Sequence, residues 1–353
     1  MTARYDAMEL QDFATALLAA AGLAPERAAC VAEVLLEGDL LGRSTHGLAL
    51  LAPYLGALEE GSMAADGDPV VVADHGSVLH WDGRLLPGPW LLTRAMDEAL
   101  ARLAEHPVVT VSIRRSHHLA ALGAYLERAT ARGAICLLTA TDPAIQSVAP
   151  FGGLDAVLTS NPIAAGIPNG DDPILIDIST SLVSNAGLWR HRARGEPLPG
   201  PWLRRGDGSL TDDAAAIDDD PPATIMALGG EDLGYKGFAL GLLVEALALA
   251  LSGHRRPTTE DGWSEGVFLQ LIDPERFAGG RNFSDAVAWL VAACRQSRVP
   301  EGAPPVRLPG EAARRRRAEQ RTHGVILDPA ILEKLAPWAE RYAITPPAAR
   351  SRS

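Results

Sequence analysis

Lysine and cysteine are the two residue types that this sequence almost lacks. Lys236 and Lys334 are the only lysines, and arginine makes up the rest of the 32 basic residues. The cysteines Cys30, Cys136 and Cys294 are odd in number and far apart, which disfavours a disulfide framework or a cysteine-based metal site. We therefore expect no metal centre and a reducing compartment. The N-terminus lacks the apolar segment of a signal peptide, so we expect a cytoplasmic protein.

The sequence also has no excess of positive charge. The 353 residues carry 32 basic and 44 acidic side chains, a formal charge of −12, which disfavours nucleic acid and anionic membranes as partners. No apolar run reaches the roughly 20 residues that span a bilayer, because Glu245 interrupts the longest one, 238–252. This run predicts a buried helix. Small-molecule partners remain compatible with the composition.

The apolar periodicity predicts an α/β protein. Residues 9–21, 25–41 and 46–59 have apolar residues at helical spacing, so helices open the chain. Short apolar runs then alternate with helical segments, as in 108–113 and 267–272, which predicts strands and helices in turn.

No G-x-G-x-x-G turn follows any predicted strand. That turn lets backbone amides approach a pyrophosphate in the ordinary dinucleotide-binding fold. If this chain binds a dinucleotide, it does so on another architecture.

Two histidines are candidates for proton transfer. His46 lies in Gly42-Arg-Ser-Thr-His-Gly47 after a predicted helix. His118 follows the strand 108–113 and is predicted to open a helix, whose dipole would keep the imidazole neutral and able to accept a proton. A purely structural role is the alternative, since His118 at a helix start can simply cap the helix.

Asp177 and Lys236 are candidates for contacts with a ligand. Asp177 ends an apolar strand and is followed by Ser179, Thr180 and Ser181, a set that suits ribose or phosphate oxygens but equally suits a helix cap. Lys236 begins an apolar helix, where it needs an anionic partner or solvent. These segments alone leave both alternatives open.

Taken in order, the segments resemble the malate/L-lactate dehydrogenase family of non-Rossmann NAD(P)-dependent oxidoreductases, which includes ureidoglycolate and sulfolactate dehydrogenases and cyclic-imine carboxylate reductases. The matching segments run nearly from end to end: Leu40-Leu-Gly-Arg-Ser-Thr-His-Gly, Ser116-His-His-Leu-Ala, Ala149-Pro-Phe-Gly-Gly, Ser160-Asn-Pro-Ile-Ala, Asp177-Ile-Ser-Thr-Ser, Gly229-Gly, Tyr235-Lys-Gly-Phe-Ala-Leu and Val306-Arg-Leu-Pro-Gly-Glu.

The resemblance implies a fold and a division into domains. The fold would be the family's non-Rossmann α/β fold, with a helical N-terminal segment and an interleaved cofactor-binding domain. Residues 1–115 would form the substrate side, 116–300 the cofactor-binding domain, and 301–345 helices that pack back on the N-terminal region. A homodimer is common in the family. Residues 346–353 are predicted to be a disordered tail.

The resemblance also implies site residues and a cofactor. His118 is similar to the family's proton-transferring histidine, and His46, with Thr45, is similar to its second relay. The cofactor would be NAD(P)H, with NADP(H) slightly preferred. The positions similar to the family's cofactor contacts are Thr141, Ser160, Asp177, Ser179, Thr180, Lys236, Leu308, Pro309 and Gly310.

Two departures bear on the substrate. Leu50 and Gly187 stand where the family carries charged residues, and leucine cannot make a bidentate contact with an anion. We therefore expect a cyclic imine or a bulky carbonyl or alcohol in place of simple malate or lactate. The alternative is a catalytically degenerate or repurposed member that binds a nucleotide or small molecule without redox turnover.

The segment 190–222 is rich in proline, arginine and aspartate. It is predicted to be a long exposed excursion that forms no core strand or helix. The sequence leaves open whether it covers the active site.

Overall fold

The computed structural model describes residues 3–256 and 262–350. Its largest element is a seven-stranded sheet with strand order β2-β3-β4-β11-β5-β6-β7. The strands are β2 (Val70–Asp74), β3 (Val78–Asp82), β4 (Val108–Ser116), β5 (Ile135–Thr141), β6 (Ile163–Ile167), β7 (Ile174–Ile178) and β11 (Glu265–Ile272).

The middle of this sheet is a strand from late in the chain. β11 pairs antiparallel with both β4 and β5, whereas β3 and β4 pair in parallel. Val267, Leu269 and Leu271 are fully buried on it, which agrees with the predicted strand at 267–272. Because β4 and β5 flank β11, the residues at the beginning of β11 lie beside the ends of both neighbours.

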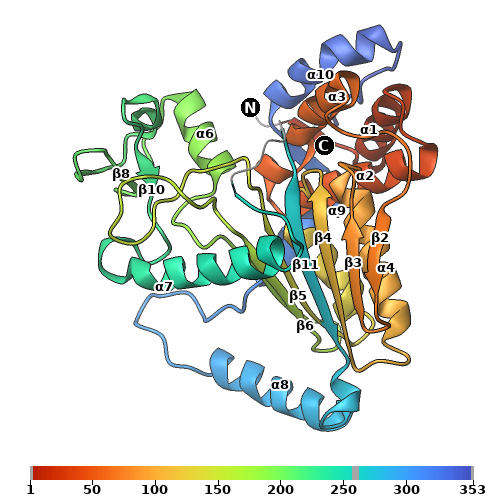
Figure 1. Cartoon of the computed structure of the whole chain (residues 1–353), viewed down its shortest axis with the longest axis vertical. Coiled ribbons are helices and arrows are strands. Elements are labelled where there is room, and N and C mark those ends of the chain that lie inside the picture. The colour runs from red at the N-terminus through yellow and green to blue at the C-terminus, as the bar shows by residue number, and fades with distance from the viewer. Residues whose placement is uncertain (1–2, 257–261, 351–353) are drawn as a thin grey trace.

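Helices cover the sheet and supply most of the main core, as Figure 1 shows for the N-terminal helices. Asp6 caps the first of them by accepting hydrogen bonds from the backbone N–H groups of Met8 and Glu9. The α-helices are α1 (Ala7–Ala20), α2 (Pro25–Leu40), α3 (Leu51–Glu60), α4 (Gly88–Arg102), α5 (Leu126–Thr130), α6 (Asn185–Arg194), α7 (Gly230–Val244), α8 (Gly280–Arg295), α9 (Glu311–His323) and α10 (Pro329–Arg341).

The C-terminal helices return to the N-terminal region. In α9, the Gln320 side chain donates to the carbonyl oxygens of Asp39 and Leu40 at 2.9 and 3.0 Å. Strand β12 (Val325–Leu327) pairs with β1 (Ala3–Tyr5), so the two ends of the chain share one small sheet. Where the domains divide stays a prediction.

The prediction for 190–222 is wrong. This segment forms β8 (Leu203–Arg204) and β9 (Leu210–Thr211), which join β10 (Thr224–Ile225) in a three-stranded sheet. Leu198 and Leu203 lie in a second buried cluster. These two leucines therefore turn inward, while charged residues of the segment pair with each other, as Arg192 does with Asp218 at 2.6 Å.

The prediction of a buried helix at 238–252 is also wrong. Helix α7 continues through a π-helical segment, Glu245–Ala250. The combined helix, Gly230–Ala250, has 21 residues, and its most apolar 18-residue stretch has a mean hydropathy of 1.5 but is only 33% buried. Length and composition alone would let such a helix cross a membrane, but a single helix of this kind is weak evidence. In Figure 1 it lies along one side of the molecule.

The predicted disordered tail, 346–353, is described as far as residue 350. Residues 344–350 have no regular secondary structure, although Arg350 donates its backbone N–H to the carbonyl of Arg4 at 2.8 Å. Residues 351–353, the rest of the predicted disordered tail, lie outside the described residues.

Candidate active site

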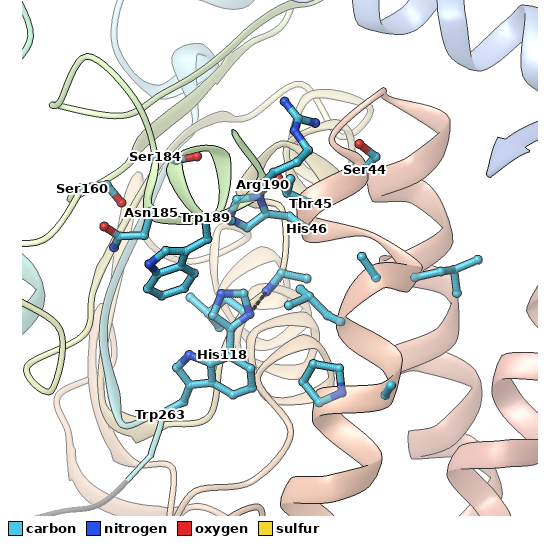
Figure 2. A pocket seen from close by; sticks show the side chains of 18 of the residues that line it. Ser44, Thr45, His46, His118, Ser160, Ser184, Asn185, Trp189, Arg190 and Trp263 are labelled. Carbon is cyan, nitrogen blue, oxygen red and sulfur yellow. Dashed lines mark hydrogen bonds between the residues drawn. The ribbon is translucent and has the colours of Figure 1, made fainter. Parts of the chain in front are cut away.

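A cavity of about 1120 Å³ opens where the N-terminal helices, the sheet and α6 meet. Its walls come from the turn after α2, the loop after β4, the end of β5, the start of β11, α6 and α10. Figure 2 shows His46 and His118 in the middle of this cavity and Ser160, Ser184 and Asn185 to one side. Segments far apart in the chain thus meet around the two histidines that the sequence singled out.

His46 stands on a short 3-10 turn, Ser44–His46, that follows α2. Its Nδ1 lies 3.0 Å from the Thr45 hydroxyl oxygen, and both residues line the cavity. Burial lowers the pKa of His46, and the negative charge of Asp177 offsets part of that shift. Arg43 holds Asp177 nearby, since its guanidinium donates to the Asp177 carbonyl at 2.8 Å.

Asp39 supports this turn from behind. Its carboxylate accepts the backbone N–H of Leu48 at 2.7 Å, and a Cβ on Gly47 would lie 2.4 Å from the same carboxyl group. Only glycine therefore lets the chain pass so close to Asp39. Burial raises the pKa of Asp39 to about 7, because no cation lies against it to stabilise the charged form.

His118 does not open a helix, contrary to the prediction. The segment after β4 has no helical residues until a 3-10 turn begins at Leu122. The pKa of His118 is still lowered, well below its usual value, but the main cause is burial and not a helix dipole. The charges of His46 and His117 add to this shift. The rings of His46 and His118 are stacked, with centroids 5.9 Å apart.

The His118 ring is held by its backbone and by Tyr54. The Ala120 N–H donates to His118 Nδ1 at 3.2 Å, and the Tyr54 hydroxyl lies 2.9 Å from the same nitrogen. Because a backbone amide can only donate, Nδ1 acts as an acceptor and the neutral ring carries its proton on Nε2. The ring therefore has a fixed orientation and a defined tautomer.

Two tryptophans flank His118 in Figure 2. The Trp263 ring lies 4.9 Å from the His118 ring, centroid to centroid. Trp189 of α6 also lines the cavity, although 51% of it is exposed. The catalytic candidates thus lie between two aromatic faces, one fixed against the sheet and one at the mouth of the cavity.

Two acidic side chains in the cavity were not found from the sequence. Glu265 and Asp142 both line it, and both are buried. Glu265 lies 3.9 Å from His118 Nε2. Burial raises the pKa of Glu265 well above its usual value, with a further contribution from the charge of Asp142. The sequence held one sign of this site: the carboxyl group of Glu265 comes two residues before the predicted strand 267–272.

The predicted cofactor contacts are only partly brought together. Thr141 and Ser160 line the cavity. Ser179 and Thr180 lie just behind it, where the Thr180 backbone N–H donates to the Ser160 carbonyl at 2.9 Å. Asp177 contacts Arg43 beside His46 but does not line the cavity.

The remaining predicted contacts lie elsewhere. Lys236 is exposed on α7, with its ammonium 5.8 Å from the Tyr235 ring. The loop Leu308-Pro309-Gly310 packs on β7, since the Pro309 carbonyl accepts the Leu175 N–H at 3.1 Å. None of these positions lines the cavity formed by the described residues, so their role in cofactor binding stays a prediction.

A nicotinamide cofactor fits the cavity by size and chemistry. Sites for small molecules occupy roughly 300–1,000 Å³, so this cavity has room for a cofactor together with a substrate. Ser160 offers a hydroxyl group and Asn185 an amide, which suit ribose, phosphate and carboxamide groups. The Thr141 hydroxyl is already bonded to Asn161, Glu245 and Arg256. Among residues 3–256 and 262–350, no cluster of histidine, cysteine and carboxylate side chains could hold a metal ion.

A sequence model of the malate/L-lactate dehydrogenase family matches residues 5–336. The chain belongs to this family. It is 33% identical to the L-lactate dehydrogenase of Cupriavidus necator over 341 residues, 94% of this chain and 96% of the relative. It is 30% identical to the (2R)-3-sulfolactate dehydrogenase (NADP(+)) of Chromohalobacter salexigens over 343 residues, 94% of this chain and 96% of the relative.

The fold of this dehydrogenase family member is shared with an imine reductase of known structure. The delta1-piperideine-2-carboxylate reductase of Pseudomonas syringae pvar. tomato superposes with a TM-score of 0.81 and is 27% identical, covering 95% of this chain and 99% of that one. The predictions of the family, of its non-Rossmann α/β fold and of a nicotinamide-dependent oxidoreductase are confirmed.

Of the two departures from the family, only Leu50 lines the cavity. Leu50 lines the cavity among other apolar residues and is 9% exposed. Gly187 lies in the first turn of α6, where its N–H donates to the Ser184 hydroxyl at 3.2 Å. In this dehydrogenase, α6 instead brings Arg190 and Arg194 to the rim of the cavity. Arg194 pairs with Asp328 at 2.8 Å.

Proposed function

We propose that this protein transfers hydride between a nicotinamide cofactor and a carbonyl, alcohol or cyclic imine carbon in the cavity around His118. The observation that carries the proposal is the pair of stacked, neutral histidines, His46 and His118, in one cavity of about 1120 Å³. Neutral imidazoles in a shielded cavity suit the exchange of a proton with an alcohol or amine. The cofactor supplies the hydride, and the protein supplies orientation and proton transfer.

His118 is the principal group that faces the reacting oxygen or nitrogen, and His46 with Thr45 forms a second relay. Both histidines line the cavity, and the ring of each is oriented by a hydrogen-bonding partner. Ser160 holds the cofactor, with Thr141, Asp177, Ser179 and Thr180 supporting that wall. NADP(H) is slightly preferred over NAD(H), in keeping with the NADP(+)-dependent relative.

The substrate is bulkier and less charged than malate or lactate. Leu50 presents an apolar surface where the resemblance leads one to expect an anion clamp, and Leu48 and Pro53 line the same part of the cavity. Trp189 adds an aromatic face to the same cavity. This wall favours a cyclic imine or a 2-oxo compound with a large apolar or planar group.

The active form is a homodimer in the cytoplasm. Helix α7 leaves Leu233, Leu240 and Leu243 between 36 and 51% exposed. An apolar face of this extent marks a protein interface, and a second copy of the chain is its simplest occupant. The described cysteines are free thiols, which suits a reducing compartment.

The second candidate is a family member that binds nucleotide without turnover. The apolar Leu50, which lines the cavity, and Gly187 favour it, because the resemblance leads one to expect charged residues at both positions.

One experiment separates the two candidates. The purified protein is titrated with NADPH and NADH by fluorescence, and panels of 2-oxo acids and cyclic imines are then added while cofactor absorbance is followed. Binding followed by substrate-dependent oxidation establishes the reductase. Binding without oxidation favours the second candidate, and no binding contradicts both.

A further inference from the structure

Helix α6 carries three arginines, and two of them have carboxylate partners. Arg192 pairs with Asp218 at 2.6 Å, and Arg194 pairs with Asp328 at 2.8 Å. Arg190 makes no hydrogen bond or ion pair with any part of the chain that the structure describes. Its guanidinium can therefore bind an anion that comes from outside these residues.

The helical repeat places Arg190 on the cavity wall. Ala186, Arg190 and Ala193 follow one another at spacings of four and three residues, so they share one face of α6, and all three line the cavity. Arg192 lies on another face and lines a second cavity of about 750 Å³. Neighbouring arginines of one helix thus face different cavities.

Within the cavity, Arg190 lies on the side of the histidines. In the view of Figure 2 its side chain is on the same side as Thr45 and His46, whereas Ser160, a predicted cofactor contact, is on the other side of Trp189. All five residues line the same cavity. This placement favours an anionic group of the substrate over a phosphate of the cofactor.

Positive side chains lie only at the mouth of the cavity. Among the described lysines and arginines, those that line it are Arg190, Arg194 and Lys334 of α10, and all three are exposed. The buried wall has apolar side chains such as Leu50 and offers no lysine or arginine. Because Arg194 is paired with an aspartate, Arg190 and Lys334 are left to attract an anion to the mouth.

We propose that Arg190 binds the carboxylate of the substrate, so that the apolar group of the substrate lies against Leu48 and Leu50 and its single negative charge lies at the mouth. The proposal rests on the proposed function and narrows its substrate class to carboxylates with one apolar or planar group. A guanidinium and a carboxylate form two parallel hydrogen bonds, which fix the orientation of the substrate. Arg190 determines specificity, while proton transfer stays with His118 and His46.

The first test measures binding without turnover. Phenylpyruvate and its methyl ester are titrated by calorimetry into the full chain, saturated with NADP+ or NAD+, for wild type, Arg190→Gln and Arg192→Gln. We expect the wild type to bind the acid about 10- to 100-fold more tightly than the ester, and Arg190→Gln to bind the two alike. Arg192→Gln is the matched control from the same helix and should behave as the wild type. A wild type without a preference for the acid, or an Arg190→Gln variant that keeps this preference, overturns the proposal.

The second test measures turnover on the best substrate of the panel. We expect Arg190→Gln to raise KM about 10- to 100-fold and to change kcat less than about threefold, because the contact orients the substrate but does no chemistry. Arg190→Lys keeps the charge without the planar pair of donors and should recover part of the loss. An unchanged KM in Arg190→Gln overturns the proposal, and so does a wild type that reduces uncharged cyclic imines as readily as their carboxylates.

The dissociation constants of NADPH and NADH separate the two sources of an anion. Arg190→Gln should change each of them less than about threefold. Weaker binding of NADPH alone would assign Arg190 to the cofactor phosphate and overturn the proposal. A wild type that binds neither cofactor contradicts the proposed function, whereas a wild type whose turnover does not depend on a substrate carboxylate contradicts this proposal alone.

Discussion

At the scale of single residues, the site is defined by buried groups that are held in their neutral forms. His118 illustrates this, because its lowered pKa and its Nδ1 contact with the Ala120 N–H leave only Nε2 to face a substrate. We expect His118→Asn to lower kcat about 10²- to 10⁴-fold, since the reacting atom loses its hydrogen-bond donor. The dissociation constant of NADPH, measured by fluorescence, should be nearly unchanged. Unchanged turnover would exclude His118 from the chemistry.

The raised pKa of Asp39 predicts how the stability of the fold depends on pH. Its pKa is raised from 3.8 to about 7 in the folded protein, so between these values the folded state binds a proton that the unfolded state lacks. Stability from this group is thus present at low pH and is lost as pH rises toward 7. Asp39→Asn cannot ionise and still offers an oxygen to the Leu48 N–H.

The measurement for Asp39 is urea unfolding across a pH series. At pH 8 we expect Asp39→Asn to exceed the wild type in free energy of unfolding by up to about 4 kcal/mol, from about 1.4 kcal/mol per pKa unit, and to differ little at pH 4. Asp12→Asn, on the exposed side of α1, is the control and should match the wild type. A difference that stays constant with pH would contradict the titration of Asp39.

At the scale of elements, α6 shapes the substrate side of the cavity. It begins with a Ser184 cap and then places Trp189 and Arg190, two and three residues after Gly187, on the cavity wall. Among the residues that the structure describes, Arg190 makes no hydrogen bond or ion pair with another side chain, so its guanidinium is available to a ligand.

Trp189→Ala should therefore change substrate recognition more than chemistry. We expect about a tenfold rise in KM for substrates with a planar or bulky group, a smaller rise for pyruvate, and kcat within about threefold. Trp189→Phe keeps an aromatic face and should restore most of the affinity. If initial-rate measurements give the same rise in KM for small and bulky substrates, Trp189 does not contribute to selection by substrate size.

The elements also show what the sequence could predict. The strand at 267–272 and the N-terminal helices followed from local periodicity, because their apolar residues repeat at a fixed spacing. His118 was placed wrongly at a helix start because the segment before Leu122 is fixed by contacts with Tyr54, a partner 64 residues away. Glu265 reaches the site only through the pairing of β11 with β4 and β5, which no local pattern reports.

At the scale of the whole molecule, two features link assembly to the site. One face of α7 and its π-helical continuation carries Glu245, which accepts a hydrogen bond from the Asn161 amide at 2.9 Å and pairs with Arg256 behind Thr141. The opposite face is apolar and exposed. Lys236 lies on this same helix, so in the proposed homodimer the second copy would determine what surrounds it.

The exposed α7 face gives the prediction at this scale. Leu240 and Leu243 lie three residues apart on the helix and are 36 and 51% exposed. A stable interface buries about 1,200–2,000 Å² with an apolar centre, and charged residues in that centre oppose association. We therefore expect the wild type to be a dimer by light scattering after size exclusion, and the double variant Leu240→Glu, Leu243→Glu to be a folded monomer.

The control for α7 carries the same charge on another exposed apolar surface. Val71 of β2 is 55% exposed, and Val71→Glu should remain dimeric with an unchanged circular dichroism spectrum. Glu245 connects α7 to Thr141. We therefore expect the monomeric double variant to bind NADPH more weakly than the wild-type dimer. A double variant that stays dimeric would place the interface elsewhere, and a wild type that is monomeric at micromolar concentration would contradict the homodimer.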